Sequence, residues 1–572
     1  MQDSYPRDPR KLLPTVAYFS MEIGLDSAIH TYSGGLGILA GDTLRAAADN
    51  GIPMAGVTLL YRKGYFRQEI NGEGYQLEYP DLWDPEEHLE LLEPRVKIRL
   101  EDREVWLRAW RYRIHGVTHH ITPVYFLDTN LPENSDFDRS LTDHLYGGDS
   151  FYRLCQEAVL GIGGVAMLRA LGIERIHPYH MNEGHSALLT IALLEEHMGS
   201  RGLAAATEKD RHAVQQKCVF TTHTPVPAGH DQFPIDMVRR ALGPERCAAL
   251  EAAGSCAQGM LNMTSLALAF SHYVNGVAMR HGDISQDMFP HYPIDSITNG
   301  VHAVMWTAQP FAELFDEHFP GWRRDNLYLR HALGIPIEQI RKAHDRCKKN
   351  LLAEVDKRTG LRLDPTVFTI GFARRMTGYK RPDLLLADAE RLRHIAAQAG
   401  PFHVLYAGKA HPHDESGKAL IHYIHKISRE LNTKIHLIFL PDYNINLAKF
   451  LVSGVDLWLN TPQKPFEASG TSGMKAALNG VPSLSVLDGW WIEGHVEGAT
   501  GWSIGDSWDG ESLPGEDIAS LYHKLENVIL PMYYRHPQEF EKVMRLSIAH
   551  NGSFFNTQRM MLQYLKNAYF DF

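Results

Sequence analysis

The segment VFTIGFARR at residues 367–375 shows the pattern that decides the fold of this chain. It is a short apolar run that ends in polar residues. Four similar runs follow it: FHVLYAGKAHP (402–412), KIHLIFLPDYN (434–444), VDLWLN (455–460) and PSLSVLD (482–488). Unbroken apolar strands that alternate with helices are typical of parallel sheets buried on both faces. The pattern therefore predicts an α/β fold whose ligands bind at the carboxyl ends of the strands.

The first half of the chain repeats this pattern. TVAYFSMEIG (15–24) leads through YSGGLG into the helical ILAGDTLRAAADNG, and KCVFTTH (217–223) runs into TPVPAGH. A break is expected after SITNGVHAVMW (296–306), where a charge-rich and mostly helical stretch begins. A chain of 572 residues is too long for a single hydrophobic core, so two large domains are the default expectation.

We therefore predict two Rossmann-like domains that face a central cleft. The first is expected over residues 1–305 and the second over residues 306–572. The terminal NTQRMMLQYLKNAYF (556–570) has the apolar spacing of a helix, and we expect it to pack back on the body of the protein.

Composition excludes several classes of protein. The net charge of −11 argues against a general nucleic-acid binder, whose phosphate contacts need a basic face. The apolar run AVLGIGGVAML (158–168) is too short to span a bilayer and is expected to be a buried helix. The N-terminal MQDSYPRDPRKLLP has no apolar signal-peptide core. Five cysteines without a C-x-x-C pair fit reduced thiols, so a cytoplasmic protein with no membrane partner is expected.

The segment EASGTSGMK (467–475) has the composition of an anion site. Gly470 and Gly473 allow the backbone to turn, and the following MKAALNG is expected to begin a helix. The N-terminus of a helix attracts anions, although the spacing of a Walker P-loop is absent. Lys475 adds a positive charge directly behind this turn.

A set of cations precedes this segment: Arg374, Arg375, Lys380, Arg381 and Lys409. A solvated charged loop is the ordinary explanation of such a set. However, Arg374 and Arg375 directly follow a buried strand, which places them where they could bind phosphate oxygens bidentately. Together with Lys475 they predict a site for two anions close together.

The first half contributes glycines and hydrogen-bonding groups. In YSGGLG the glycines allow close approach of a ligand, although a simple tight turn remains the alternative. A metal site in HPYHMNEGHS (177–186) is disfavoured, because His180 and His185 lack the i, i+4 spacing of a zinc helix. His223 is either a core histidine or a ligand contact. Asp149, Asn299 and Glu467 are groups of the kind that read sugar hydroxyls. The residues alone thus predict a two-domain enzyme that joins a sugar to a phosphate-bearing ligand.

The motifs resemble those of the glycogen and α-glucan phosphorylases. EASGTSGMKAALNG followed by LDG resembles their pyridoxal-phosphate segment. VAYFSMEIGL, GGLG, LLYRKGYFRQ, LYGGDSFYRLCQEAVL, TTHT, SHYVNGVA, TNGVH, RRMTGYKRP, AGKAHP and IFLPDYNINLA follow in the family's order and cover nearly the whole chain. The chain is most similar to the short bacterial and archaeal type. The resemblance implies the GT-B architecture of glycosyltransferases.

The resemblance also implies roles for single residues. Lys475 would hold pyridoxal 5′-phosphate covalently. The residues that would line this cofactor are Arg374, Tyr443, Ser469, Gly470 and Thr471. Orthophosphate would be held by Arg375, Lys380 and Gly35. The glucosyl unit would be contacted by Leu36, Asp149, His223, Asn299, Glu467 and Ser469, with His185 nearby. Lys475, Arg375, Lys380 and His223 would form the catalytic set, and no metal is implied.

In the family, the cofactor's phosphate relays a proton to orthophosphate, which attacks the terminal glucose of an α-1,4-glucan such as maltodextrin, glycogen or starch. The implied reaction is reversible and gives α-glucose 1-phosphate with retained configuration. Two neighbouring phosphates repel each other unless cations compensate, and Arg375 and Lys380 would do so. A homo-oligomer is a further expectation. The rival classes are a nucleotide-sugar glucosyltransferase and a catalytically silent glucan-binding protein.

The chain departs from the family pattern at several positions. Gly473 stands where the family usually has asparagine. Trp490 and Trp491 stand where small polar residues are usual, and they either stack on acceptor sugars or belong to the core.

Overall fold

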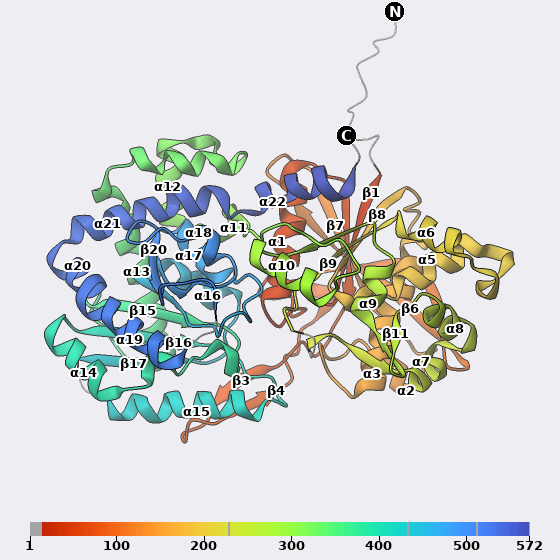
Figure 1. Cartoon of the computed structure of the whole chain (residues 1–572), viewed down its shortest axis with the longest axis horizontal. Helices are drawn as coiled ribbons and strands as arrows, with labels where there is room; N and C mark the ends of the chain where they lie inside the picture. Colours follow the sequence, from red (N-terminus) through yellow and green to blue (C-terminus); the bar gives the residue numbers. More distant parts are fainter. Residues whose placement is uncertain (1–13, 227–228, 432–433, 511–512, 571–572) are drawn as a thin grey trace, which may run out of the picture.

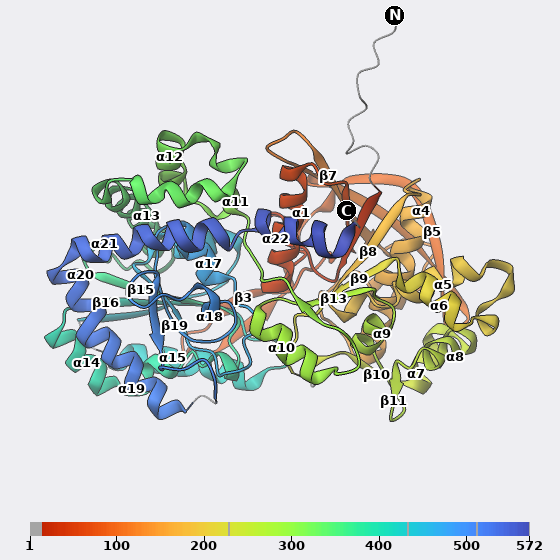
Figure 2. The same cartoon turned by 45° about the horizontal axis from the view of Figure 1, so that its top comes forward.

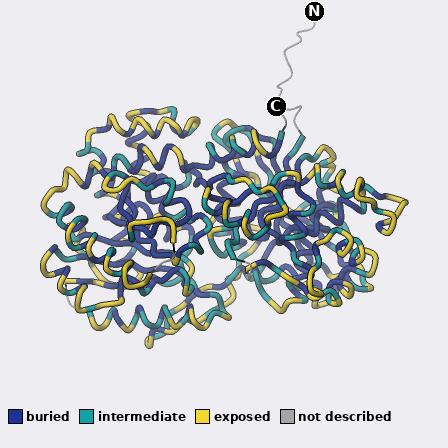
Figure 3. The backbone as a smooth tube through the Cα atoms, viewed as in Figure 1, coloured by how far each residue is buried: buried dark blue, intermediate teal, exposed yellow. Residues whose placement is uncertain are grey.

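Two β-sheets lie side by side in the computed structural model of this chain (Figure 1). The structure describes residues 14–226, 229–431, 434–510 and 513–570. The expectation that residues 1–14 lack an apolar signal-peptide core concerns a segment of which only residue 14 is described. In the tube view, buried backbone fills the interior around both sheets and exposed backbone lies at the rim (Figure 3).

The first sheet has nine strands. Their order across the sheet is β14 (Asp295–Ser296), β13 (Tyr273–Gly276), β9 (Cys218–Thr221), β8 (Ile176–Asn182), β1 (Thr15–Ser20), β2 (Met54–Leu59), β7 (Ile121–Asp128), β6 (Arg103–His115) and β5 (Glu90–Leu100). Parallel pairing runs from β14 to β7. All of β2 and nearly all of β1 are buried, as expected for parallel strands covered on both faces.

The parallel sheet predicted for this half carries an antiparallel addition that was not predicted. Strands β5, β6 and β7 pair antiparallel and extend the sheet at one edge. Burial along β5 alternates, which is the signature of an antiparallel strand with one solvated face. The alternating segment VKIRLEDREVWLRAW is the signal in the sequence that indicates this addition.

The second sheet has six strands, all parallel. Their order is β17 (Ile435–Leu440), β16 (Phe402–Ala407), β15 (Phe368–Ala373), β18 (Leu457–Asn460), β19 (Ser483–Val486) and β20 (Gly501–Ile504). The five apolar runs quoted above form five of these strands. The mixed α/β fold with parallel sheets is thus confirmed.

Helices connect the two sheets. Between β14 and β15 lie α11 (Ala303–Trp306), α12 (Gln309–His318) and α13 (Ile337–Thr359), which form the expected helical stretch. The last helix, α22 (Thr557–Tyr564), returns to the first sheet and packs against α1 (Gly35–Asn50), as Figure 2 shows. The apolar run at 158–168 is a buried helical segment. In the part of the chain that the structure describes, no helix combines the length and the apolar character needed to cross a membrane.

Candidate active site

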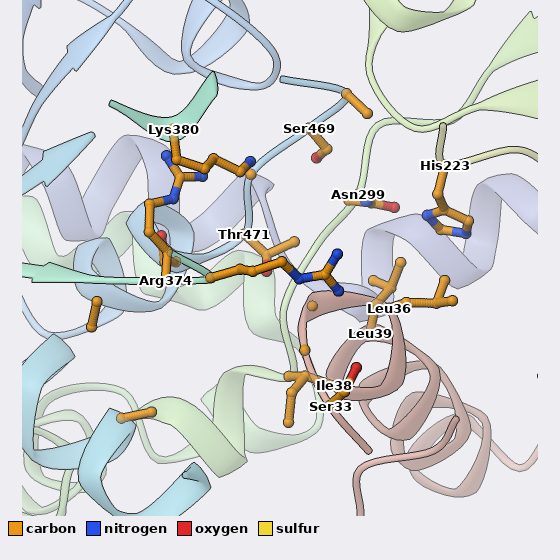
Figure 4. A pocket seen from close by; sticks show the side chains of 18 of the residues that line it. Ser33, Leu36, Ile38, Leu39, His223, Asn299, Arg374, Lys380, Ser469 and Thr471 are labelled. Carbon is orange, nitrogen blue, oxygen red and sulfur yellow. The ribbon is translucent and has the colours of Figure 1, made fainter. Parts of the chain in front are cut away.

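A cavity of about 340 Å³ lies where the two sheets face each other. It is lined by the loops that follow the strands of the second sheet, by the start of α1 and by single residues of the first half. Most of the predicted site residues line it: Gly35, Leu36, His223, Asn299, Arg374, Arg375, Lys380, Tyr443, Glu467, Ser469, Gly470, Thr471 and Lys475. In Figure 4, Arg374, Lys380 and Thr471 lie on one side and His223, Asn299 and Leu36 on the other.

Lys475 stands on α17 (Ser472–Leu478), directly behind the glycine-rich turn. Gly470 has a φ of 77°, a left-handed conformation that favours glycine. The ammonium of Lys475 lies 3.9 Å from the centre of the Trp306 ring. Burial lowers the pKa of Lys475 to about 8, although the nearby Asp42 opposes this effect. The amine is therefore easier to deprotonate, and so more nucleophilic near neutral pH, than an ordinary lysine.

Trp306 is a functional candidate that the sequence analysis missed. Its indole N–H donates to Asp42 Oδ2 at 2.7 Å, and the same oxygen accepts from the backbone N–H of His302 at 3.0 Å. Asp42 is fully buried. These contacts fix the indole plane against Lys475. No local motif indicates this role, because Trp306 and Lys475 meet only through the fold.

Glu467 binds two of the predicted cations. Arg374 Nη2 and Lys380 Nζ each lie 2.6 Å from its Oε2 atom. Burial by itself raises the pKa of Glu467, but Arg374 and Lys380 together lower it to about 2. The carboxylate therefore stays charged at neutral pH and fixes both cations at the cavity wall.

Several buried polar atoms in this cavity have no hydrogen-bond partner among the residues that the structure describes. They are Nε and Nη1 of Arg374, Oγ of Ser469 and Oδ1 of Asn299. Buried donors of this kind are costly unless a ligand satisfies them. The guanidinium and hydroxyl donors lie around the glycine-rich turn, which is the arrangement expected for an anion.

Arg375 reaches across the cavity to the start of α1. Its Nη2 atom lies 3.4 Å from the position that a Cβ atom on Gly34 would occupy. A Cβ atom added to Gly35 would lie in open space. The structure thus brings Arg375 next to the glycine turn with which it was predicted to act, although the two are far apart in sequence.

Glu22 holds that turn in place and was also missed. Its Oε2 accepts from the backbone N–H groups of Ser33 at 2.5 Å and Gly34 at 3.1 Å. Its Oε1 accepts from the Tyr146 hydroxyl at 2.8 Å. The buried carboxylate therefore orients the loop before α1.

His223 lies at the carboxyl end of β9 as expected, and its ring is held by the first sheet. Its Nε2 atom lies 2.6 Å from Asn182 Oδ1, and its backbone N–H donates to Glu183 Oε2 at 2.7 Å. Burial lowers the pKa of His223 to about 4, so the ring is neutral near pH 7. A neutral ring that donates through Nε2 leaves Nδ1 as an acceptor for a hydroxyl.

Comparison with known proteins decides the family. The carbohydrate phosphorylase family model matches residues 25–105 and 243–500. The chain belongs to the carbohydrate phosphorylase family. Maltodextrin phosphorylase of Thermococcus litoralis is 38% identical over 97% of this chain and 70% of its own length. Glycogen phosphorylase of Mycobacterium tuberculosis is 37% identical over 97% of this chain and 71% of its own length. Glycogen phosphorylase of Aquifex aeolicus is 34% identical over 97% of this chain and 86% of its own length.

The predicted family is therefore confirmed, and this phosphorylase is an enzyme of the glycosyl-transferring type.

Two predicted contacts of this phosphorylase do not line the cavity. Asp149 is exposed and accepts from the backbone N–H of Tyr152, which caps α3 (Ser150–Ala158). His185 Nε2 lies 3.3 Å from Asp231 Oδ2. Their contact with a glucosyl unit stays a prediction. Among the residues that the structure describes, no three side chains come together as metal ligands would.

The two tryptophans after LDG belong to the core. Trp490 and Trp491 are 3% and 1% exposed, and Trp490 packs edge-on against Phe555. A side chain on Gly473 would begin 2.7 Å from Trp490 Cζ2. Glycine at position 473 is therefore matched to the large side chain at position 490, which explains two departures from the family pattern together.

Proposed function

We propose that this phosphorylase is an α-1,4-glucan phosphorylase. It transfers the terminal α-1,4-linked glucosyl unit of maltodextrin, glycogen or starch to orthophosphate. The reaction is reversible and gives α-glucose 1-phosphate with retained configuration. The observation that carries the proposal is the single cavity in which Lys475 lies beside a cationic cluster and faces His223 and Asn299.

The cavity fits pyridoxal 5′-phosphate. Lys475 has a lowered pKa, and it lines the same cavity as the donors of Arg374 and Ser469 that lack a partner among the described residues. The residues proposed to hold the cofactor are Lys475, Arg374, Tyr443, Ser469, Gly470 and Thr471. When bound, the cofactor supplies a second phosphate group that relays a proton to orthophosphate.

Arg375 and Lys380 are proposed to bind orthophosphate. Arg374, Arg375 and Lys380 carry three positive charges, and Glu467 offsets one of them. The remaining positive charge compensates the repulsion between two neighbouring anions, because opposite charges at close range attract each other. Gly35 allows the phosphate to approach the backbone, since no side chain occupies that space.

His223, Asn299 and the start of α1 are proposed to bind the glucosyl unit. Within the described part of the chain, Asn299 Oδ1 is buried without a partner, and the neutral ring of His223 offers an acceptor. Leu36, Glu467 and Ser469 complete this contact set. His223, Asn299 and Ser469 orient sugar hydroxyls without adding charge, and the Glu467 carboxylate accepts from a hydroxyl while it neutralises part of the cationic cluster.

We further infer that the two sheets form two domains in the GT-B arrangement, over residues 1–305 and 306–572. The separate sheets support this division, and the cavity between them is the position expected for the active site of such a pair.

The test is release of glucose 1-phosphate from a linear maltodextrin by the purified protein, with and without orthophosphate. Release that depends on orthophosphate is expected. Hydrolysis to free glucose, or transfer only from a nucleotide sugar, would overturn the proposal.

A further inference from the structure

A β-hairpin of the first half reaches across to the second sheet. It consists of β3 (Arg67–Ile70) and β4 (Gln76–Tyr79), which pair antiparallel with each other. Figure 1 shows the hairpin beside α15 (Glu415–Glu430), away from the sheet that precedes it in sequence. Tyr75 stacks on His422 of that helix, with ring centres 4.2 Å apart.

Two glutamines face inward from this hairpin. Gln68 is 2% exposed and Gln76 is 6% exposed, which is unusual for such a polar residue. Gln68 Nε2 donates to Gln76 Oε1 at 2.8 Å, so the two carboxamides form one unit. We name this pair the glutamine clamp.

The clamp binds the loop after β16 through its backbone. Gln76 Oε1 accepts from the N–H of Ala410 at 3.0 Å, and Gln76 Nε2 donates to the carbonyl of the same residue at 2.9 Å. Gln68 Nε2 donates to the carbonyl of Gly408 at 2.9 Å. Lys409, which lines the cavity, lies between these two residues.

The clamp also binds the loop after β17. Gln68 Oε1 accepts from the N–H of Asp442 at 2.9 Å, and the Gln68 N–H donates to Asp442 Oδ1 at 3.1 Å. Asp442 has a φ of 55°, a conformation that a non-glycine residue adopts at a cost. The next residue, Tyr443, lines the cavity.

The loop after β16 in turn holds the arginine segment. The N–H of Arg374 donates to the carbonyl of Ala407 at 3.2 Å, and the N–H of Met376 donates to the carbonyl of Lys409 at 3.1 Å. The residue between them is Arg375. A side chain on Gly408 would begin 2.0 Å from the Arg374 carbonyl oxygen, so the two segments are in direct backbone contact.

We propose that Gln68 and Gln76 are positioning residues for the orthophosphate site. The clamp fixes the loop of Lys409, and through it Arg375, at the geometry that binds the anion. The inference rests on the proposed function for the identity of the anion. Neither glutamine lines the cavity, and both act through hydrogen bonds to the backbone.

The test compares Gln68→Met and Gln76→Met with wild-type holoenzyme. Methionine keeps the length of the side chain and removes every carboxamide hydrogen bond. Glu73→Gln, an exposed position in the turn of the same hairpin, is the matched control. If a methionine variant does not fold, Gln76→Asn keeps the carboxamide and withdraws it from Ala410 by one methylene group.

We expect the KM for orthophosphate to rise about tenfold, since a small displacement of binding groups is costly. The KM of the methionine variants for maltodextrin should stay within about twofold of wild type, because His223 and Asn299 stand on other loops. The control variant should keep both KM values within about twofold of wild type. Hydrogen exchange at the amides of Ala410 and Asp442 should become faster. A uniform loss of kcat with both KM values unchanged would indicate a merely structural role and overturn the proposal.

A calorimetric titration with inorganic phosphate separates this inference from the proposed function. If the wild type releases no glucose 1-phosphate, the proposed function fails, but weaker phosphate binding by the variants still supports the clamp. If the variants bind phosphate as tightly as the wild type, the clamp proposal is wrong, whatever the reaction.

Discussion

Asp488 holds Glu467 through the backbone. The N–H of Glu467 donates to Asp488 Oδ2 at 2.9 Å, and the N–H of Gly489 donates to Oδ1 at 2.9 Å. Asp488 is 3% exposed and lies behind the cavity wall. One buried carboxyl group thus orients the turn whose own carboxylate fixes Arg374 and Lys380.

Asp488 should make the stability of the protein depend on pH. Burial raises its pKa from 3.8 to about 7, and the neighbouring charge of Glu467 adds to this effect. Between about pH 4 and pH 7, Asp488 is deprotonated in the unfolded chain and still protonated in the folded protein. The free energy of unfolding therefore falls as the pH rises through this range. The loss is at most about 4 kcal/mol.

Asp488→Asn keeps an acceptor for Glu467 and removes the titration. The asparagine loses the acceptor for the Gly489 N–H, so an offset from wild type is expected, and the stability of the variant relative to the wild type should rise between pH 4 and pH 7 in urea unfolding. Asp102→Asn, at a fully exposed position, is the control and should show no such trend. A constant difference between Asp488→Asn and wild type across this range would contradict the assignment.

Lys475→Ala should give a folded protein without bound pyridoxal phosphate and without activity. The glycine-rich turn supplies donors, but the covalent attachment depends on the amine. Absorbance of the purified protein and phosphorolysis of maltodextrin measure the two effects. Lys449→Ala, at an exposed position in α16 (Ile445–Gly454), should retain both. Normal turnover by cofactor-free Lys475→Ala protein would refute the role.

Arg375→Ala should mainly weaken the use of orthophosphate. Removal of one charge-stabilising donor costs about 2–4 kcal/mol in kcat/KM. Initial rates at saturating maltodextrin and varied orthophosphate measure the change. Arg362→Ala, whose side chain is 91% exposed, is the control. An unchanged dependence on orthophosphate would show that Arg375 does not bind it.

Gly473→Ala should destabilise the protein, because the new methyl group meets Trp490 in the core. Overpacking of this kind costs about 1–3 kcal/mol. Gly515→Ala is the matched control, since a side chain there meets open space. Thermal unfolding of the two variants gives the comparison, and equal midpoints would mean that Trp490 moves aside freely.

The sequence was sufficient for the strand series and for most of the chemical groups. The apolar runs of the second half correspond to β15 to β19, because strands buried on both faces must be apolar throughout. The glycine-rich turn and the cations that follow β15 were likewise visible as local motifs. The antiparallel edge formed by β5 and β6 was missed, although its alternation is present in the sequence.

Tertiary structure alone decided which distant residues meet. Trp306 lies on Lys475, and the glutamine clamp binds loops more than three hundred residues away in sequence. Such contacts leave no local pattern, because hydrogen bonds to backbone groups do not depend on the side chain of the partner. Asp149 shows a related effect, since its side chain caps α3 in the fold, a role that the sequence analysis did not predict. Local periodicity therefore determined the elements, and the meeting of loops and helix ends from the two halves of the chain determined the site.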